Sequence, residues 1–108
     1  MSYGSPVYSS TKGALTTLTR SLGVQYAAEG IRINSVCPAA MMTNFGPSAG
    51  FTVSKEIEDY SASIFPMKRN IEAAECAKAA LFLASDLSSA LTGINLPVDG
   101  GLSAGLKF

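Results

Sequence analysis

Residues 30–38 decide the fold, and they read Gly30-Ile31-Arg32-Ile33-Asn34-Ser35-Val36-Cys37-Pro38. From residue 31 to residue 37 the side chains alternate with the period of a short strand. Gly30 is typical of the end of a helix, and Pro38 ends the strand because proline has no amide hydrogen to donate to a sheet. The stretch therefore predicts a helix that passes directly into a strand and then into a loop.

The segment before Gly30 predicts one long helix. We expect it to start near Tyr8, after Pro6, and to run to about Ala28. The apolar residues that recur at helical intervals are Leu15, Leu18, Leu22 and Tyr26. Gly13 has no side chain, which permits another helix or a cofactor to approach the backbone closely, although tight packing is the plainer interpretation.

Two further helices and a second strand are predicted after Pro38. Residues 44–52 have the composition of a loop, and an amphipathic helix then ends near Pro66. Its apolar side consists of Val53, Ile57, Tyr60 and Ile64. Asn70 is placed to cap the next helix. The packed side of that helix is predicted to hold Ala73, Ala77, Leu81 and Ala84. Residues 94–98 read as the last strand, and Asp99 as a structural residue of the turn that follows.

The composition indicates one globular domain without a strong charge. The chain has 108 residues, of which 47% are apolar, and eight basic residues balance eight acidic ones. This balance favours a small neutral ligand and gives no reason to expect nucleic acid or an anionic membrane surface as a partner. With no histidine and no Cys-x-x-Cys pattern, we expect no metal site.

The cysteines and the start of the chain bear on the cellular compartment. Cys37 and Cys76 lie in apolar surroundings, which predicts reduced, buried thiols and a cytoplasmic protein. The first residues do not have the pattern of a signal peptide, and no apolar run approaches the ~18 residues of a membrane-spanning helix. We therefore expect a soluble chain with no membrane partner.

Tyr8 and Lys12 form the candidate catalytic pair. Their spacing places a phenol and an ammonium on one face of a helix. A phenol ordinarily loses its proton near pH 10, so it works as a proton shuttle at neutral pH only when a cation stabilises the phenolate. The pair predicts carbonyl reduction or alcohol oxidation, while a solvated helix start with an exposed lysine is the alternative interpretation.

Three ordered blocks of the sequence resemble the short-chain dehydrogenase/reductase family. The blocks are Tyr8-x-x-x-Lys12, Arg32-x-Asn34-x-x-x-Pro38 and Val98-Asp99-Gly100-Gly101. They match the C-terminal part of the family, whose nucleotide-binding half and catalytic serine precede the tyrosine. The resemblance implies an α/β fold, the C-terminal part of a Rossmann-like doubly wound parallel sheet, with the N-terminal nucleotide-binding half missing. We expect residues 1–108 to form a single partial domain.

The resemblance also implies a site for NAD or NADP. Tyr8 and Lys12 are expected to bind the cofactor as well as to act in catalysis. The loop after the strand is expected to add Pro38, Ala39, Met41 and Thr43. Ala39 stands where the family has glycine, so a positive φ here would cost about 1 kcal/mol. An apolar loop buried only for packing is the alternative.

The implied reaction is hydride transfer between the cofactor and a small carbonyl or alcohol substrate. Tyr8 moves the proton, and the helix that ends near Pro66 corresponds to the variable lid of the family. Because the sequence has no glycine-rich phosphate fingerprint, we do not expect full turnover by the chain alone. A second hypothesis is a non-enzymatic fragment that forms a homo-oligomer or associates with full-length relatives. A gene product without a function of its own is the third.

Overall fold

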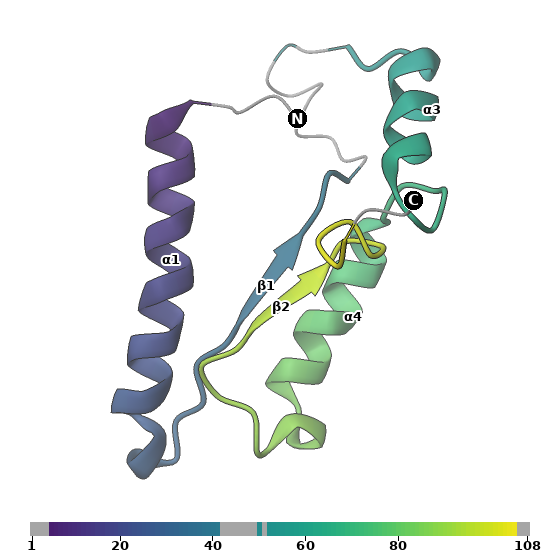
Figure 1. Cartoon of the computed structure of the whole chain (residues 1–108). Helices are drawn as coiled ribbons and strands as arrows, with labels where there is room; N and C mark the ends of the chain where they lie inside the picture. Colours follow the sequence, from purple (N-terminus) through teal and green to yellow (C-terminus); the bar gives the residue numbers. More distant parts are fainter. Residues whose placement is uncertain (1–4, 42–49, 51, 106–108) are drawn as a thin grey trace. The chain divides into compact units, whose positions relative to one another are not determined.

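In a computed structural model of the chain, the described residues are 5–41, 50 and 52–105. Helices and strands follow one another in the predicted order (Figure 1). They are α1 (Pro6–Gln25), the 3-10 helix η1 (Ala27–Glu29), β1 (Ser35–Pro38), α3 (Lys55–Ile64), α4 (Ala73–Ala84), the 3-10 helix η2 (Asp86–Ser88) and β2 (Asn95–Val98). None of the helices in the described part is both long and apolar enough to cross a bilayer.

The chain divides into two compact units, and each is described by itself. The first unit consists of Met1–Ser35 and Phe82–Leu96, so it contains α1 and η2. The second unit consists of Val36–Leu81 and Pro97–Phe108, so it contains α3 and most of α4.

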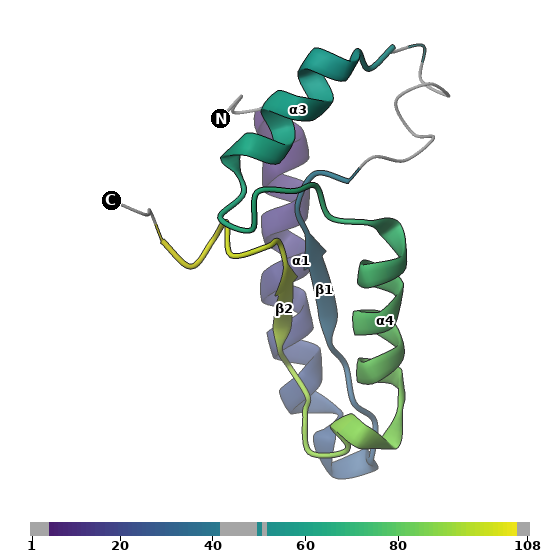
Figure 2. The same cartoon turned by 90° about the vertical axis from the view of Figure 1, so that its right-hand side faces the viewer.

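The strands β1 and β2 form a two-stranded parallel sheet, in which both arrows point the same way (Figure 2). Ser35 N donates a hydrogen bond to Ile94 O at 2.9 Å, and Ala39 N donates to Val98 O at 3.2 Å. Both bonds keep the same offset along the chain, which is the register of parallel strands. The predicted α/β class with parallel strands is confirmed.

The strand β1 begins at Ser35 and is therefore shorter than the strand predicted from residue 31. Immediately before β1, the side chain of Asn34 forms hydrogen bonds with two main-chain groups. Asn34 Oδ1 accepts from Ile94 N at 3.1 Å, and Asn34 Nδ2 donates to Leu91 O at 2.9 Å. A side chain that binds the neighbouring backbone competes with the regular ladder, which alternation of residue types does not reveal.

Arg32 ties the segment before β1 to the end of α4. Its guanidinium donates to Leu83 O at 2.8 Å, to Ser88 Oγ at 2.9 Å and to Ser85 O at 3.1 Å. A longer bond of 3.4 Å reaches Leu91 O. A cation that binds the last carbonyl groups of a helix also opposes the negative end of its dipole. Arg32 therefore serves the architecture of the first unit.

Both ends of α1 lie earlier in the sequence than predicted. The helix begins at Pro6, because proline suits the first helical position, where no amide hydrogen is needed. It ends at Gln25, since η1 forms a separate tighter turn that Gly30 closes with a φ of 75°. Apolar residues recur at helical intervals through α1 and η1, so this pattern does not show where α1 ends and η1 begins.

The buried side of α1 differs from the predicted apolar side. Thr19 and Gly23 are the buried residues of the helix. Leu15 and Leu18, two of the apolar residues that recur at helical intervals, have exposed fractions of 51% and 49%. Small residues rather than large ones make the closest contact of this helix.

That contact is a crossing of backbones at Gly23 and Gly93. A Cβ atom on Gly23 would lie 2.4 Å from Gly93 Cα, a distance that real Cβ atoms do not adopt. Gly93 itself has a φ of 75°, which favours glycine. A close approach was expected at Gly13 instead, but a Cβ atom there would have nothing within 4 Å.

Asn70 does not cap α4, contrary to the prediction. Ser61 Oγ donates to Asn70 Oδ1 at 2.8 Å, and Asn70 Nδ2 donates to Glu58 O at 3.1 Å, so this side chain binds α3. At the start of α4 the carboxylate of Glu75 accepts from Glu72 N at 3.0 Å. That bond is the returning half of a capping box.

The packed side of α4 was also predicted wrongly. The four residues expected there are exposed, namely Ala73, Ala77, Leu81 and Ala84. Leu83 is buried instead, and Cys76 and Ala79 are half-buried. Because α4 has apolar residues on more than one side, periodicity alone does not identify the side that packs.

The small core of the second unit surrounds Gly100. Phe65 is fully buried and Ile71 nearly so. A Cβ atom on Gly100 would lie 3.1 Å from Ile71 Cδ1 and 3.4 Å from Phe65 Cδ1.

Cys37, at the end of β1, is exposed rather than buried as predicted. The apolar residues around Cys37 were the reason to expect burial, but a strand of four residues leaves some of its side chains exposed.

Candidate active site

Tyr8 and Lys12 lie together in the first turns of α1. Lys12 Nζ is 5.4 Å from the centre of the Tyr8 ring, within the range of a cation–π contact. The prediction that their spacing brings the phenol and the ammonium to one helix face is confirmed. Tyr8 is 62% exposed, so the pair is accessible to a ligand.

The donors of the Lys12 ammonium are not used elsewhere in the described part of the chain. Across residues 5–41, 50 and 52–105, Lys12 Nζ makes no hydrogen bond and no ion pair, and its contact is with the Tyr8 ring. An ammonium has three N–H donors and no acceptor. It can therefore hold hydroxyl oxygens of a bound molecule without first breaking a bond within the protein.

Pro38, Ala39 and Met41, the predicted cofactor contacts after the strand, lie in the second unit. Ala39 continues the sheet through its bond to Val98 O. Met41 forms an isolated parallel bridge with Ile71, so the backbone there is already paired within the protein. Thr43 lies outside the described residues. The structure thus groups these contacts at the end of β1, in a different unit from Tyr8 and Lys12.

The alanine at position 39 is not strained. Among the described non-glycine residues, only Lys68 has a positive φ, at 57°. Ala39 therefore adopts a conformation that any residue tolerates, and the energetic cost foreseen for a positive φ does not arise.

Asp99 holds the turn after β2. Asp99 Oδ2 accepts from Ser103 N at 2.8 Å, and Asp99 Oδ1 accepts from Gly101 N at 3.0 Å. Hydrogen bonds from the side chain and backbone of Ser103, and from Gly101, lower the pKa of the Asp99 carboxyl. This is the structural role expected from the sequence.

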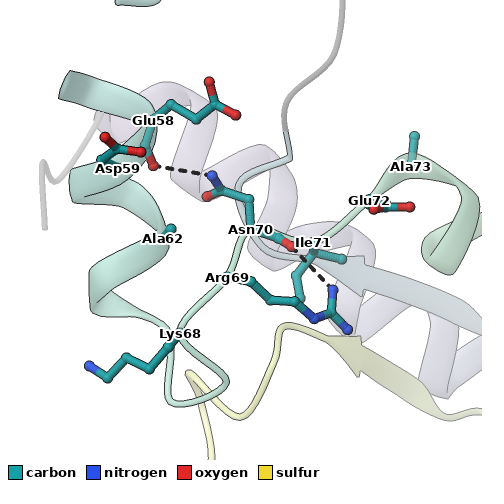
Figure 3. Close-up of a pocket in the computed structure, with 9 residues that line it drawn as sticks. All are labelled: Glu58, Asp59, Ala62, Lys68, Arg69, Asn70, Ile71, Glu72 and Ala73. Atoms are coloured by element: carbon teal, nitrogen blue, oxygen red, sulfur yellow. Dashed lines mark hydrogen bonds between the residues drawn. The ribbon is translucent and has the colours of Figure 1, made fainter. Parts of the chain in front are cut away.

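A hollow of about 380 Å³ opens between α3 and the segment that leads into α4 (Figure 3). Its lining is Glu58, Asp59, Ala62, Lys68, Arg69, Asn70, Ile71, Glu72 and Ala73. Arg69 at its rim forms two hydrogen bonds with Glu75, at 2.7 and 2.8 Å. None of the predicted site residues that the structure describes lines it, and several of its polar side chains bind groups outside the lining, as Lys68 binds Ser63 O and Asn70 binds Ser61 Oγ.

Sequence reasoning missed Asn95. Asn95 Nδ2 donates to Thr16 O at 3.2 Å, and Asn95 Oδ1 accepts from Ser35 Oγ. One side chain of β2 thus binds both β1 and the helix that carries Tyr8 and Lys12. The available signal was the residue type, since asparagine is uncommon inside strands and usually has a specific hydrogen-bonding reason to be there.

Comparison of sequences identifies a family over almost the whole chain. A family model described as Enoyl-(Acyl carrier protein) reductase matches residues 1–103. Meso-2,3-butanediol dehydrogenase of Serratia marcescens is 39% identical over 102 residues, which cover 94% of this chain and 39% of that protein. Glucose 1-dehydrogenase of Gluconobacter oxydans is 43% identical over 98 residues, which cover 89% of this chain and 35% of that protein. The chain spans about two fifths of the length of such relatives.

Solved structures match in the same partial way. The chain resembles the ligand-free aldohexose dehydrogenase of Thermoplasma acidophilum with a TM-score of 0.87 and 31% identity, over 100% of this chain and 45% of that one. A short-chain dehydrogenase family protein from Francisella tularensis gives a TM-score of 0.82 at 31% identity, over 97% and 46% of the two chains. Under half of each of those structures corresponds to the present fold.

Proposed function

Because the chain belongs to the short-chain dehydrogenase/reductase family, we propose that it carries the catalytic segment of an NAD(P)-dependent oxidoreductase that interconverts a carbonyl and an alcohol. The observation that carries this proposal is the contact between Lys12 and the ring of Tyr8 at the exposed start of α1. A phenol beside a cation is suited to exchange a proton with an oxygen atom of a substrate.

The chemistry of these residues fits one end of a dinucleotide. The ammonium of Lys12 has donors for the hydroxyl groups of a ribose. Pro38, Ala39 and Met41 are proposed for the nicotinamide on the ground of the family alone. Thr43 belongs to the same proposed set. The sequence has no glycine-rich loop for the pyrophosphate, so the residues of this chain fit the nicotinamide half of the cofactor and not the rest.

In the proposed reaction, Tyr8 donates its proton to the carbonyl oxygen during reduction and takes it back during oxidation. The ammonium of Lys12 lies over the ring of Tyr8 and is thus held beside the group that moves the proton. A nicotinamide cofactor, held by the residues proposed above, would supply the hydride for reduction or accept it in oxidation. The rest of the chain contributes by holding the side chains of Tyr8 and Lys12 in place.

The relatives suggest which substrates to test. Their names refer to butanediol, glucose and aldohexoses, all of which are small molecules with hydroxyl groups next to one another. We infer that the substrate is a small polyol or sugar, or the carbonyl compound formed from it. A neutral ligand of this kind also agrees with the balanced charge of the chain.

Two measurements test the proposal. NADH and NADPH are titrated into the 108-residue chain while fluorescence is followed, and circular dichroism of the same samples checks folding. The chain is then assayed with meso-2,3-butanediol and glucose, alongside Tyr8→Phe. Saturable binding and turnover that Tyr8→Phe abolishes would support the proposal. Tyr60→Phe is the matched control, because it removes a phenol oxygen from another exposed helical tyrosine. Equal rates for wild type and Tyr8→Phe would refute the role of Tyr8.

A second candidate function is association with a full-length relative without catalysis. The observation that favours it is the exposure of Leu15 and Leu18 on α1, which leaves large apolar side chains in contact with water. Under this hypothesis Leu18→Glu breaks co-purification with the relative, whereas Thr17→Glu on a different side of the helix does not. Tyr8→Phe leaves the association intact. Failure of the wild-type chain to co-purify would remove this candidate.

A further inference from the structure

Asn95 joins three segments of the chain within the first unit through one carboxamide. Its Nδ2 donates to Thr16 O in α1, and its Oδ1 accepts from Ser35 Oγ at the start of β1. Asn95 is itself the first residue of β2. The bond to α1 ends one helical turn from Lys12, and Thr16 Oγ1 in turn donates to Lys12 O at 3.3 Å.

Another tie between α1 and the segments that lead into the strands lies nearer the C-terminal end of the helix. There Gly23 approaches Gly93, and Thr92 Oγ1 donates to Gly23 O at 3.2 Å. A helix that is fixed only near one end can still change its angle about that point. The bond from Asn95 to Thr16 supplies a second point, about two turns closer to the end that carries Tyr8.

From this arrangement we propose that Asn95 is a positioning residue, which sets the placement of the Tyr8–Lys12 end of α1 relative to Ser35 and Asn95 within the first unit. The inference rests on the proposed function, since Tyr8 and Lys12 need positioning only if they act on a substrate. The residue type fits the task. The contact with Thr16 O needs a donor and the contact with Ser35 Oγ needs an acceptor, and a carboxamide provides both on one rigid group.

Hydrogen–deuterium exchange of the 108-residue chain tests the placement without depending on activity. Asn95→Asp keeps the size of the side chain and its acceptor for Ser35, but it faces Thr16 O with a second acceptor. We expect amides of residues 8–16 to exchange about fivefold faster, as for one lost hydrogen bond, while residues 20–24 keep their wild-type rates. Unchanged exchange at residues 8–16, or equal acceleration along the whole helix, would overturn the inference.

Two further variants make the result specific. Ser35→Ala removes the partner that orients Asn95 and keeps the donor to Thr16, so a smaller acceleration confined to residues 8–16 is expected even if Asn95→Asp does not fold. Asn70→Asp is the matched control. It makes the same chemical change in the second unit, where Asn70 Nδ2 binds Glu58 O. Acceleration at residues 8–16 in Asn70→Asp would contradict the proposal.

Turnover separates this inference from the proposed function. If the wild-type chain is active, Asn95→Asp should lower kcat about tenfold with KM unchanged, because misplacement of Tyr8 affects the reacting geometry more than substrate binding. A change in KM alone would count against positioning. If the wild type binds no NAD(P)H and turns over no substrate, the proposed function fails, and the exchange measurements still decide whether Asn95 places this end of α1.

Discussion

The guanidinium of Arg32 and the ammonium of Lys12 are both part of the sequence blocks that mark the family, yet their surroundings differ. Arg32 donates to four acceptors around the end of α4 and the turn after it. Lys12 touches the ring of Tyr8, and its donors are otherwise unused within the described residues. The comparison separates two kinds of motif residue. Arg32 is committed to the fold, while Lys12 keeps its hydrogen-bonding capacity for a ligand.

The largest effect that follows from this comparison is on stability at Arg32. Arg32→Met keeps most of the aliphatic stem but removes the charged donor of four hydrogen bonds, so we expect unfolding free energy to fall by about 3 kcal/mol. Urea unfolding followed by circular dichroism measures the loss. Arg20→Met, at an exposed position of α1, is the control and should change stability by less than about 0.5 kcal/mol. Similar losses in both variants would break the comparison.

The glycines of α1 offer a second, matched pair. Gly23→Ala forces a methyl group against the backbone of Gly93 and should cost about 2 kcal/mol by overpacking. Gly13→Ala meets open space and should stabilise the helix by about 0.5 kcal/mol, because alanine is the better helix former. Thermal unfolding of the two variants gives the sign of each change. A stabilised Gly23→Ala would show that the backbone crossing is not tight.

The ion pair between Arg69 and Glu75 lies between the cases of Arg32 and Lys12, because its side chains are partly exposed to water and yet bonded to each other. Hydrogen bonds from Arg69 and from Glu72 N lower the pKa of Glu75 from 4.5 to about 2. Because the folded-state pKa lies below the unfolded value, the contribution to stability is complete above about pH 4.5 and is lost as pH falls towards 2. Unfolding midpoints between pH 6 and pH 2 should therefore fall less steeply in Glu75→Gln than in wild type. The same steepness in both proteins would be the contrary result.

The smallest effect on stability is expected at Tyr8. Its exposed phenol oxygen contributes no hydrogen bond within the described part of the chain, so Tyr8→Phe should change unfolding free energy by less than about 0.5 kcal/mol. The measurement is the same urea titration used for Arg32→Met. A loss of 2 kcal/mol or more would place Tyr8 with the residues committed to the fold. A small change together with lost turnover would instead sharpen the contrast with Arg32.

What the sequence predicts well is local in origin. The order of helices and strands follows from periodicity and from Gly30 and Pro38, and the contact of Tyr8 with Lys12 follows from helical spacing alone. The errors concern which side of a helix is buried, as for Ala77 and Leu81 in α4, because burial depends on what packs against that side.

Hydrogen bonds between distant segments were equally beyond the sequence. The role of Asn70 depends on a carbonyl group of α3, and that of Asn95 depends on Ser35 and Thr16, which lie far away along the chain. Residue type indicates that such side chains need partners but does not identify the partners.

The long separation between paired segments also bears on the order of events during synthesis. The bonds that hold Arg32 and Asn34 reach residues 51 to 60 positions further along. Such nonlocal contacts must close a large loop before they stabilise anything, which slows folding. On the ribosome, α1 and residues 30–38 emerge well before Leu83, the first of these partners. Until translation has passed that point, Arg32 and Asn34 therefore lack these partners, and during this interval the segment is exposed to misassociation.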